Sequence, residues 1–333
     1  MDTAERSVGI DAPMQPACVD VSVVVVNYNT AHLLHEMRDA LNRSQGALTL
    51  QTIIIDNASR DDSAEVLRRD FGEAELIFNS RNVGFGRANN QALPMVTGRY
   101  VLLLNTDAFV SPDTLTKTVA YMDAHPDAGI LGVRLIGRDG ALQPSCRYFP
   151  TPWNVFLNRT GLRRFFPRVR MVDDMAWDHA SARECDWVPG CYYLVRRELI
   201  AEVGLFDPRF FLYYEEVDHC RVAVAAGWKV VCDARTDVVH LGGESAKSDS
   251  TLTSAGKQIS ALQVESELLY FRKHFGLPGV LASAVLASLA DFGIVFKRVL
   301  RSRETDEHRT SWVHFTTLWS MAGRTRFGSR PTR

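Results

Sequence analysis

Four short apolar runs stand before residue 110, and an Asp or Asn lies at the end of each. The runs are residues 21–27, 52–56, 75–78 and 101–107. Runs that are apolar throughout are typical of parallel strands buried on both faces, and helical patterns of apolar residues separate them here. This alternation predicts an α/β fold with a largely parallel sheet and right-handed crossovers.

The regular alternation stops after residue 127. The pattern there predicts a few shorter elements and one segment, 149–184, that cannot be folded from its sequence because Arg, Pro, Phe and Trp are mixed without a period. The expected strands are 129–136, 141–148, 187–195, 228–232 and 236–240, and the expected helices are 196–203, 215–227 and 255–275.

The composition of the chain argues against nucleic-acid-binding, zinc-binding and secreted proteins. The chain has 38 basic and 39 acidic residues, so its overall charge gives no reason to expect nucleic acid as a partner. Its six cysteines include no C-x-x-C pair, which favours reduced thiols in the cytosol over a zinc site. Residues 1–19 lack the basic-then-apolar pattern of a signal peptide, and we expect a flexible lead there and a protein that is not secreted.

Polar side chains at the predicted strand ends form the candidate site. Parallel strands bring their carboxyl ends to one sheet edge, where open α/β sheets bind ligands. Carboxylates there can accept from a base N–H or a ribose hydroxyl, and amides can bond base and phosphate oxygens. Any one of these residues is more often a helix cap, whereas the whole set favours a nucleotide. The set is Asn27, Asn29, Asp56, Asn82, Arg87 and Asp107.

Residues 84–89 (Gly-Phe-Gly-Arg-Ala-Asn) share two glycines with a dinucleotide-binding fingerprint. The third glycine is missing, and the motif follows the third strand instead of the first. We therefore interpret Gly84 and Gly86 as a tight turn into a helix, with Arg87 free to face a phosphate.

Six ordered motifs resemble glycosyltransferase family 2, and most of all its rhamnosyltransferase-like branch. They cover roughly residues 20 to 275. The motifs are Val-Val-Val-Asn-Tyr-Asn (24–29), Ile-Asp-Asn-Ala-Ser-Arg-Asp (55–61), Asn-Val-Gly-Phe-Gly-Arg-Ala-Asn-Asn (82–90), Leu-Leu-Leu-Asn-Thr-Asp (102–107), Trp-Val-Pro-Gly-Cys-Tyr-Tyr-Leu-Val-Arg-Arg (187–197) and Gly-Leu-Phe-Asp-Pro-Arg-Phe-Phe-Leu-Tyr-Tyr-Glu-Glu-Val-Asp (204–218).

The resemblance implies a GT-A fold and an inverting sugar transfer from a nucleotide-diphosphate donor, assisted by Mg²⁺ or Mn²⁺. It implies Asp107 as the anionic metal ligand. The family's Asp-x-Asp motif is Asn-Thr-Asp here, so Asn105 is expected to contact the sugar nucleotide instead of the metal. His240 lies 24 residues beyond Glu216 and is a second expected ligand, with a hydrogen-bonded strand-end histidine as the alternative.

The family's Glu-Asp pair is Glu215-Glu216 in this chain. Glu216 is the expected catalytic base, with Glu215 and Asp218 as the other candidate catalytic carboxylates. Acids at a helix N-terminus are also common for electrostatic reasons alone. Trp187 and Gly190 are expected beneath the transferred sugar, although a structural bulge would explain the same residues.

The C-terminal end carries a different signal. Residues 277–296 are a largely apolar stretch broken by Pro278, Asp291 and Gly293, and residues 297–333 hold nine basic against three acidic residues with interleaved aromatics. A spanning helix would place Asp291 in the interior of the bilayer, which is unfavourable, so we expect an interfacial helix on an anionic membrane. Packing against the domain or a second subunit in a homo-oligomer is the alternative. The Arg- and Phe-rich segment 159–170 is expected to share that membrane surface.

Together these features predict three regions: the lead 1–19, a catalytic domain 20–245 with a nucleotide-sugar half (20–127) and an acceptor and base half (128–245), and a helical, basic region 246–333. The leading hypothesis is a cytoplasmic enzyme at the inner face of the membrane. It would move rhamnose from dTDP-rhamnose to a lipid-linked or cell-envelope glycan. A UDP-hexose donor and a sugar-nucleotide-binding module without turnover are the alternatives.

Overall fold

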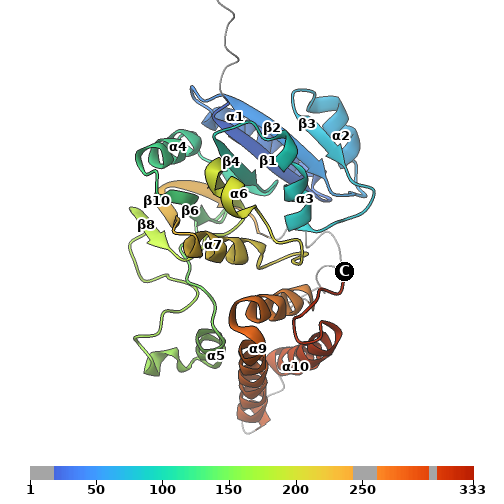
Figure 1. Cartoon of the computed structure of the whole chain (residues 1–333), viewed down its shortest axis with the longest axis vertical. Helices are drawn as coiled ribbons and strands as arrows, with labels where there is room; N and C mark the ends of the chain where they lie inside the picture. Colours follow the sequence, from blue (N-terminus) through green and yellow to red (C-terminus); the bar gives the residue numbers. More distant parts are fainter. Residues whose placement is uncertain (1–18, 243–260, 300–305) are drawn as a thin grey trace, which may run out of the picture.

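The structure is a computed structural model that describes residues 19–242, 261–299 and 306–333 (Figure 1). The expected lead 1–19 therefore lies almost wholly outside the described residues, as does the beginning of the helix expected at 255–275. Within these ranges an α/β domain occupies one end of the molecule, and helices project from it at the other end.

The predicted parallel strands form half of one sheet, in the order β3-β2-β1-β4. Helices connect these strands and cover both sides of the sheet, because both faces of β1 are apolar. Val23 and Val25 pack on one side of the sheet, and Val24 and Val26 pack on the other. The elements are β1 (Val21–Asn27), α1 (Ala31–Ser44), β2 (Leu50–Asp56), α2 (Ser63–Asp70), β3 (Glu75–Phe78), α3 (Phe85–Gln91) and β4 (Tyr100–Leu104).

The second half of the sheet is mixed, with the order β4-β9-β6-β10-β5. Strand β9 is antiparallel to β4 and β6, whereas β10 runs parallel to β6. The elements are β5 (Ala108–Val110), α4 (Thr114–Ala124), β6 (Ala128–Ile136), β7 (Leu142–Gln143), β8 (Ala182–Cys185), β9 (Tyr192–Arg196), α6 (Arg197–Val203), α7 (Glu215–Ala225) and β10 (Lys229–His240).

Several local expectations differ from the structure. The strand expected at 141–148 is only the two-residue β7, and the strand expected at 187–195 is β9, which begins at Tyr192. The two strands expected at 228–232 and 236–240 are one strand, β10, whose pairing with β6 shifts register between Asp233 and Asp237. Such a bulge leaves residues unpaired without ending the strand, and the sequence pattern mistook it for a loop. The segment 149–184 contains helix α5 (Pro152–Thr160), which begins with a capping box between Thr151 and Asn154, and the short helix η2 (Leu162–Phe165).

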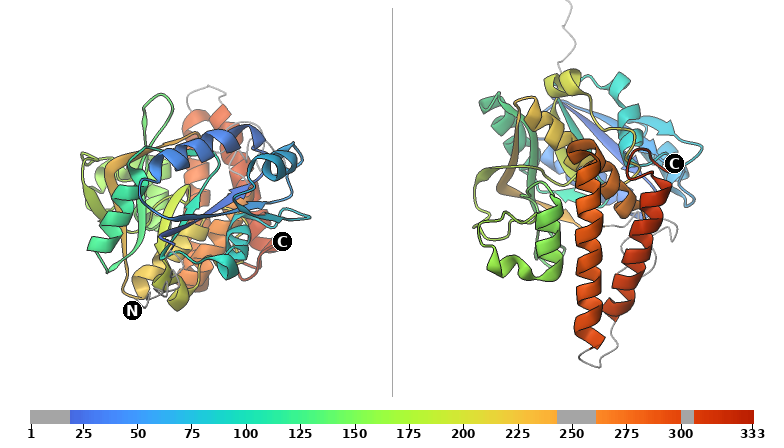
Figure 2. Two further views of the ribbon diagram at one scale, coloured as in Figure 1. Left: turned by 90° about the horizontal axis from the view of Figure 1, so that it is seen from above. Right: turned by 60° about the horizontal axis from the view of Figure 1, so that its bottom comes forward.

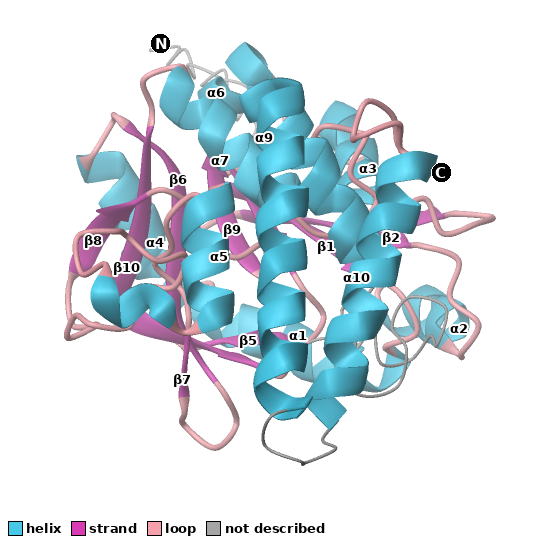
Figure 3. Ribbon diagram, turned by 90° about the horizontal axis from the view of Figure 1, so that it is seen from below, coloured by secondary structure: helices cyan, strands magenta, loops and turns pink. Residues whose placement is uncertain are grey.

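Helix α9 (Ala261–Val299) bends at Gly276, whose φ of 66° is left-handed, and it pairs with α10 (Asp306–Arg324). The first part of α9 joins the apolar core on the α7 side of the sheet through Leu268, Tyr270 and Phe271. The second part, α10 and α5 lie side by side and extend away from the sheet (Figures 1 and 3). Figure 2 shows the α9–α10 hairpin projecting beside α5 and η2.

Candidate active site

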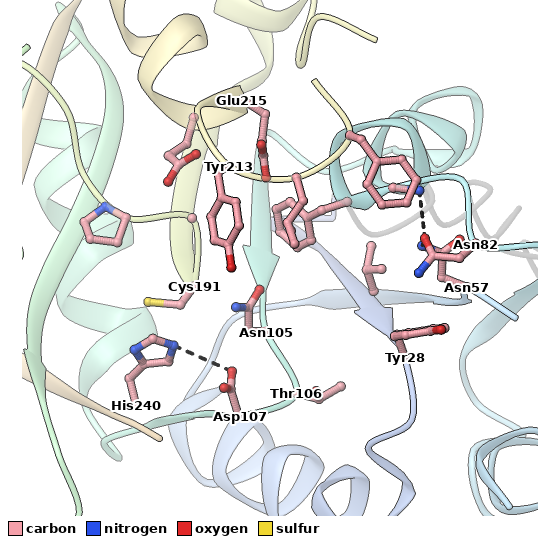
Figure 4. A pocket seen from close by; sticks show the side chains of 18 residues that line it. Tyr28, Asn57, Asn82, Asn105, Thr106, Asp107, Cys191, Tyr213, Glu215 and His240 are labelled. Carbon is pink, nitrogen blue, oxygen red and sulfur yellow. Dashed lines mark hydrogen bonds and ion pairs between the residues drawn. The ribbon is translucent and has the colours of Figure 1, made fainter. Parts of the chain in front are cut away.

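A pocket lies at the carboxyl ends of β1 and β4, and loop 204–214 with the start of α7 forms its opposite wall (Figure 4). The sheet edge supplies Asp107 and Asn105, and the α7 side supplies Glu215 and Glu216. The full lining is Val26, Tyr28, Asn57, Asn82, Gly84, Phe85, Asn105, Thr106, Asp107, Pro189, Gly190, Cys191, Phe211, Leu212, Tyr213, Glu215, Glu216 and His240.

Strand pairing places the two expected metal ligands together. Asp107 ends the turn after β4, and the next residue, Ala108, pairs with His240 across the antiparallel β5–β10 ladder. Oδ1 of Asp107 and Nε2 of His240 consequently lie 3.7 Å apart (Figure 4). Both side chains face the pocket, although 133 residues separate them in the sequence.

Gln143 on β7 fixes the orientation of the His240 ring. Its amide nitrogen donates to the backbone carbonyl of His240 over 2.8 Å, which turns its Oε1 toward Nδ1 of the ring at 3.0 Å. Because that oxygen can only accept, Nδ1 carries the proton and Nε2 faces Asp107 as a lone-pair donor. A metal-binding histidine commonly has this arrangement.

The donor set therefore fits a divalent cation. A carboxylate oxygen and an imidazole nitrogen converge from neighbouring strands, and manganese accepts both kinds of ligand. The described residues contain no group of three or more His, Cys, Asp or Glu side chains placed to hold a metal ion, so phosphate oxygens would have to complete the coordination.

The two carboxylates at the start of α7 differ in environment. Glu215 is 3% exposed, and its Oε2 has no hydrogen-bond partner among the described residues. Burial, with the neighbouring charge of Glu216, holds the pKa of Glu215 well above its usual range. Glu216 is half-buried; desolvation raises its pKa as well, and the charge of Arg147 opposes that rise. Glu216, which is less buried and feels the charge of Arg147, is thus the member of the pair that more readily carries the negative charge.

The backbone before α7 is strained in the direction that aims these side chains. Tyr213 and Tyr214 have φ angles of 70° and 68°, a left-handed conformation that costs a residue with a Cβ on the order of 1 kcal/mol or more. Tyr213 lines the pocket between Glu215 and Asn105 (Figure 4). Non-glycine residues hold such angles where the surrounding structure forces them, and they gather at functional sites.

Gly84 and Gly86 let α3 approach that strained loop. The φ of Gly84 is 90°, and a Cβ there would lie 2.4 Å from the carbonyl oxygen of Phe211, which accepts from the N–H of Phe85. A Cβ on Gly86 would lie 3.2 Å from Cβ of Phe206. The glycines thus serve loop packing as well as the turn that we expected.

A second, polar pocket adjoins the first and shares Tyr28 and Asn82 with it. Asp56 lines it at the end of β2, where Nδ2 of Asn27 donates to its Oδ1 over 2.8 Å. Its other polar residues are Ser59, Arg60, Arg68, Asn79, Ser80 and Arg81.

Two sequence-predicted residues take part in the site indirectly. Asn27 is buried and orients Asp56 and Ser59 through its amide. Asn29 has a left-handed φ of 54° and bonds Ser59 and the backbone N–H of Arg60. Neither side chain lines either of these two pockets.

Three others lie away from both pockets. Asp218 is buried against Lys273 and His274 of α9, at 2.6 and 2.7 Å, and so ties α7 to α9. Arg87 donates to the carbonyls of Pro208 and Arg333. Trp187 is buried, with its indole N–H on the carbonyl of Tyr148, whereas Gly190 of the same motif does line the pocket. The sequence motif could not distinguish these partners, since it records proximity along the chain only.

Several residues in the pocket or directly behind it were not predicted. Asn57 stands beside Asp56 and bonds Asn82, so its position after a strand was a usable signal. Tyr28 and Thr106 lie within motifs already noted. Gln143 gave no signal, because only the pairing of β7 with β6 brings it to His240.

Comparison with known proteins shows which family this chain resembles. The profile described as "Glycosyl transferase family 2" matches residues 22–177. The N-acetylglucosaminyl-diphospho-decaprenol L-rhamnosyltransferase of Mycobacterium tuberculosis is 26% identical over 244 residues, which cover 68% of this chain and 78% of that protein. Residues 22–177 belong to glycosyltransferase family 2. The predicted family and enzyme class, with its rhamnosyltransferase-like branch, are confirmed.

Solved structures confirm the fold. A mannosyltransferase from Pyrobaculum calidifontis, determined with GDP-Man and Mn²⁺, superimposes with a TM-score of 0.52 at 18% identity, over 95% of this chain and 90% of that one. Residues 1–349 of TarS from S. aureus give a TM-score of 0.50 at 14% identity, over 93% and 92%. This family 2 glycosyltransferase accordingly has the GT-A fold, with a curled, mostly parallel sheet and C-terminal helices.

Proposed function

We propose that this glycosyltransferase is a metal-dependent inverting enzyme that transfers rhamnose from dTDP-rhamnose to a lipid-linked or cell-envelope glycan. The observation that carries the proposal is one pocket with two chemically different walls. Asp107 and His240 stand on the sheet side, and Glu216 stands on the α7 side. A donor diphosphate and an acceptor hydroxyl need these two environments.

On the sheet side, Asp107 and His240 would hold the cation, and Gln143 orients the imidazole. A divalent ion in that place supplies positive charge to the departing diphosphate. Mn²⁺ and Mg²⁺ both suit the carboxylate, while the imidazole favours Mn²⁺. Asn105 lines the pocket next to Asp107 and has an amide suited to the sugar nucleotide.

On the opposite wall, Glu216 accepts the proton of the acceptor hydroxyl as that oxygen attacks the anomeric carbon. Its raised pKa makes the ionised carboxylate a stronger base than an exposed glutamate. Burial disfavours the ionised form of Glu215, and so disfavours a second negative charge beside Glu216. Attack from the face opposite the leaving diphosphate inverts the anomeric centre.

The adjoining polar pocket suits the nucleoside of the donor. Asp56 can accept from a pyrimidine N–H or a ribose hydroxyl, and Asn82 connects this pocket with the first. The rhamnosyl donor and the lipid acceptor rest on the named relative, whose acceptor is a diphospho-decaprenol. We extend this to a place of action at the cytoplasmic face of the membrane.

A donor panel tests the proposal. The purified enzyme is given dTDP-rhamnose, UDP-glucose and UDP-N-acetylglucosamine with Mn²⁺, Mg²⁺ or EDTA, and release of nucleoside diphosphate is measured with and without a polyprenyl-diphosphate acceptor. Acceptor-dependent release of dTDP that EDTA abolishes is the expected result. If UDP were released in preference to dTDP, the donor would be a UDP-sugar instead of dTDP-rhamnose. Donor binding without any release would identify a sugar-nucleotide-binding module instead.

A further inference from the structure

An unusually apolar surface covers the end of the molecule farthest from the sheet. The outward side of α9 exposes Leu281, Val285, Leu289, Phe292 and Phe296, which recur every three or four residues and so lie on one face of the helix. On α10, Trp312 and Trp319 are exposed and lie seven residues apart, which also places them on one face of their helix. The α9–α10 hairpin lies beside α5, at the same end of the molecule (Figures 2 and 3).

The segment after α5 adds basic residues to that end. Phe165 is 62% exposed and Phe166 is 41% exposed, and they stand next to exposed Arg163, Arg164 and Arg168. From residue 152 to 172 the chain has five arginines and no acidic residue. We call the exposed apolar residues of α9 and α10, together with residues 163–168, the distal face.

Asp291 is the one charged residue between 277 and 296, and it points inward. It is 2% exposed and pairs with Arg159 of α5 and with Nδ1 of His314 of α10, at 2.7 Å. Arg159 also donates to Nε2 of His314 over 3.1 Å. The distal face of α9 is therefore uninterrupted by charge, which the sequence alone did not show.

The buried contacts among Asp291, Arg159 and His314 also limit how the distal face can contact a membrane. By length and composition, residues 261–296 contain a stretch that could cross a bilayer. However, Arg159 belongs to the same segment as the exposed arginines, and it holds the middle of α9 against α5. Crossing would carry this ion pair into hydrocarbon or break it, and both are costly. Lying in the interface leaves it intact.

We propose that the distal face docks on the surface of a bilayer that contains anionic phospholipids. Apolar side chains of α9 and α10 enter the acyl boundary, and Arg163, Arg164 and Arg168 meet the phosphates. Charge complementarity selects this partner over a second copy of the chain, because two copies would bring like-charged arginine segments together. The inference extends the proposed lipid-linked acceptor, and its test needs neither donor nor acceptor.

The experiment is flotation of the full-length protein with vesicles of phosphatidylglycerol mixed with phosphatidylcholine, and with phosphatidylcholine alone. We expect flotation with the anionic vesicles and a lower partition coefficient with the neutral ones. R163Q/R164Q is expected to reduce the partition coefficient about thirty-fold at low salt, and L289Q/F296Q at least about tenfold. The controls R43Q/R69Q on α1 and α2 and Val224→Gln on α7 change exposed residues elsewhere and should float as the parent does.

Other outcomes overturn the proposal. If the protein does not float, and light scattering shows a dimer that L289Q/F296Q dissociates, the distal face is an interface between copies. If vesicle-bound protein resists extraction by alkaline carbonate, α9 spans the bilayer. A monomer that does not float has no membrane-docking face. Near-normal glycosyl transfer to a water-soluble acceptor by L289Q/F296Q would separate loss of docking from failure of the proposed activity.

Discussion

Gln143 and His240 exchange two hydrogen bonds, one from the glutamine amide nitrogen to the histidine carbonyl at 2.8 Å and one from Nδ1 of the ring to the amide oxygen at 3.0 Å. Together they fix both the backbone and the ring of a residue whose Nε2 faces Asp107. The imidazole is thus oriented before any cation arrives. Gln143 acts through His240, as a positioning residue.

Substitution of Gln143 tests this role. Gln143→Ala removes the acceptor for Nδ1–H, and we expect Mn²⁺ affinity to fall roughly 10–100-fold, the usual effect of losing a partner behind a metal-binding histidine. Electron paramagnetic resonance of Mn²⁺ titrated into the protein with nucleoside diphosphate measures it. Gln143→Glu keeps the acceptor and should retain most of the affinity. Equal, undiminished affinity in both variants would remove Gln143 from the metal site.

Asp107→Ala should abolish the metal-dependent part of donor binding, because it removes the anionic ligand of the pair. Calorimetry with dTDP, in the presence of Mn²⁺ and of EDTA, measures the two parts separately. The variant's affinity is expected to match the parent's EDTA value in both conditions. A persistent gain of affinity on adding Mn²⁺ would show that the cation binds elsewhere.

Glu216→Gln should keep donor affinity while turnover falls by roughly 10²–10⁴, the usual contribution of a general base. Glu215→Gln is the matched control, since burial raises the pKa of Glu215 and so favours the protonated form, which an amide resembles. Turnover and donor affinity of both variants are measured at one pH. Near-normal turnover in Glu216→Gln alongside a large loss in Glu215→Gln would exchange their roles.

The buried Glu215 also predicts how stability depends on pH. Desolvation raises its pKa in the folded state above the unfolded value of 4.5, so folding favours the protonated form. Its contribution is complete below pH 4.5 and is lost as pH rises through the folded pKa. Glu215→Gln cannot ionise and should lose less stability between acid and alkaline pH. Urea unfolding at several pH values measures this; parallel curves for both proteins would contradict it.

Gly84→Ala should lower both stability and turnover. The φ of 90° disfavours a Cβ, and that atom would stand 2.4 Å from the carbonyl oxygen of Phe211, so loop 204–214 must move. We expect the free energy of unfolding to fall by about 1–3 kcal/mol, which thermal denaturation measures. Gly72→Ala, with no atom within 4 Å of the added Cβ, is the control and should leave the melting temperature nearly unchanged. If Gly84→Ala melted at the same temperature as the parent protein, the close contact between Gly84 and the Phe211 carbonyl would be contradicted.

The parallel half of the sheet could be predicted because its information is local. Each strand is a continuous apolar run with a polar stop, and each connecting helix shows its own period, as at Leu33, Leu34 and Met37. The mixed half was harder. The bulge in β10 looks like two strands in sequence, since an interruption of alternation is the same whether a loop or a register shift causes it.

The candidate site divides in the same way. Its strand-end members, such as Asn105 and Asp107, were predictable because a parallel sheet gathers its carboxyl ends. Asp218 and Arg87 belong to matching motifs, but their partners come from distant segments, Lys273 and Pro208. Whether a polar side chain faces a pocket or an ion pair depends on which segments pack beside it, and the motif holds no such information.

The sequence by itself determined the family, the fold class and the sheet edge at which Asp107 stands, because apolar periodicity and strand-end polarity are properties of neighbouring residues. Only the tertiary structure decided which side chains meet. Antiparallel pairing of β5 with β10 brings His240 to Asp107, and the β7–β6 pair brings Gln143 to His240. Likewise, packing of α5 and α10 on α9 turned Asp291 inward, where its charge is compensated by Arg159. The physical reason is that a buried polar group must find a partner, and the chain supplies that partner from wherever the fold brings one close.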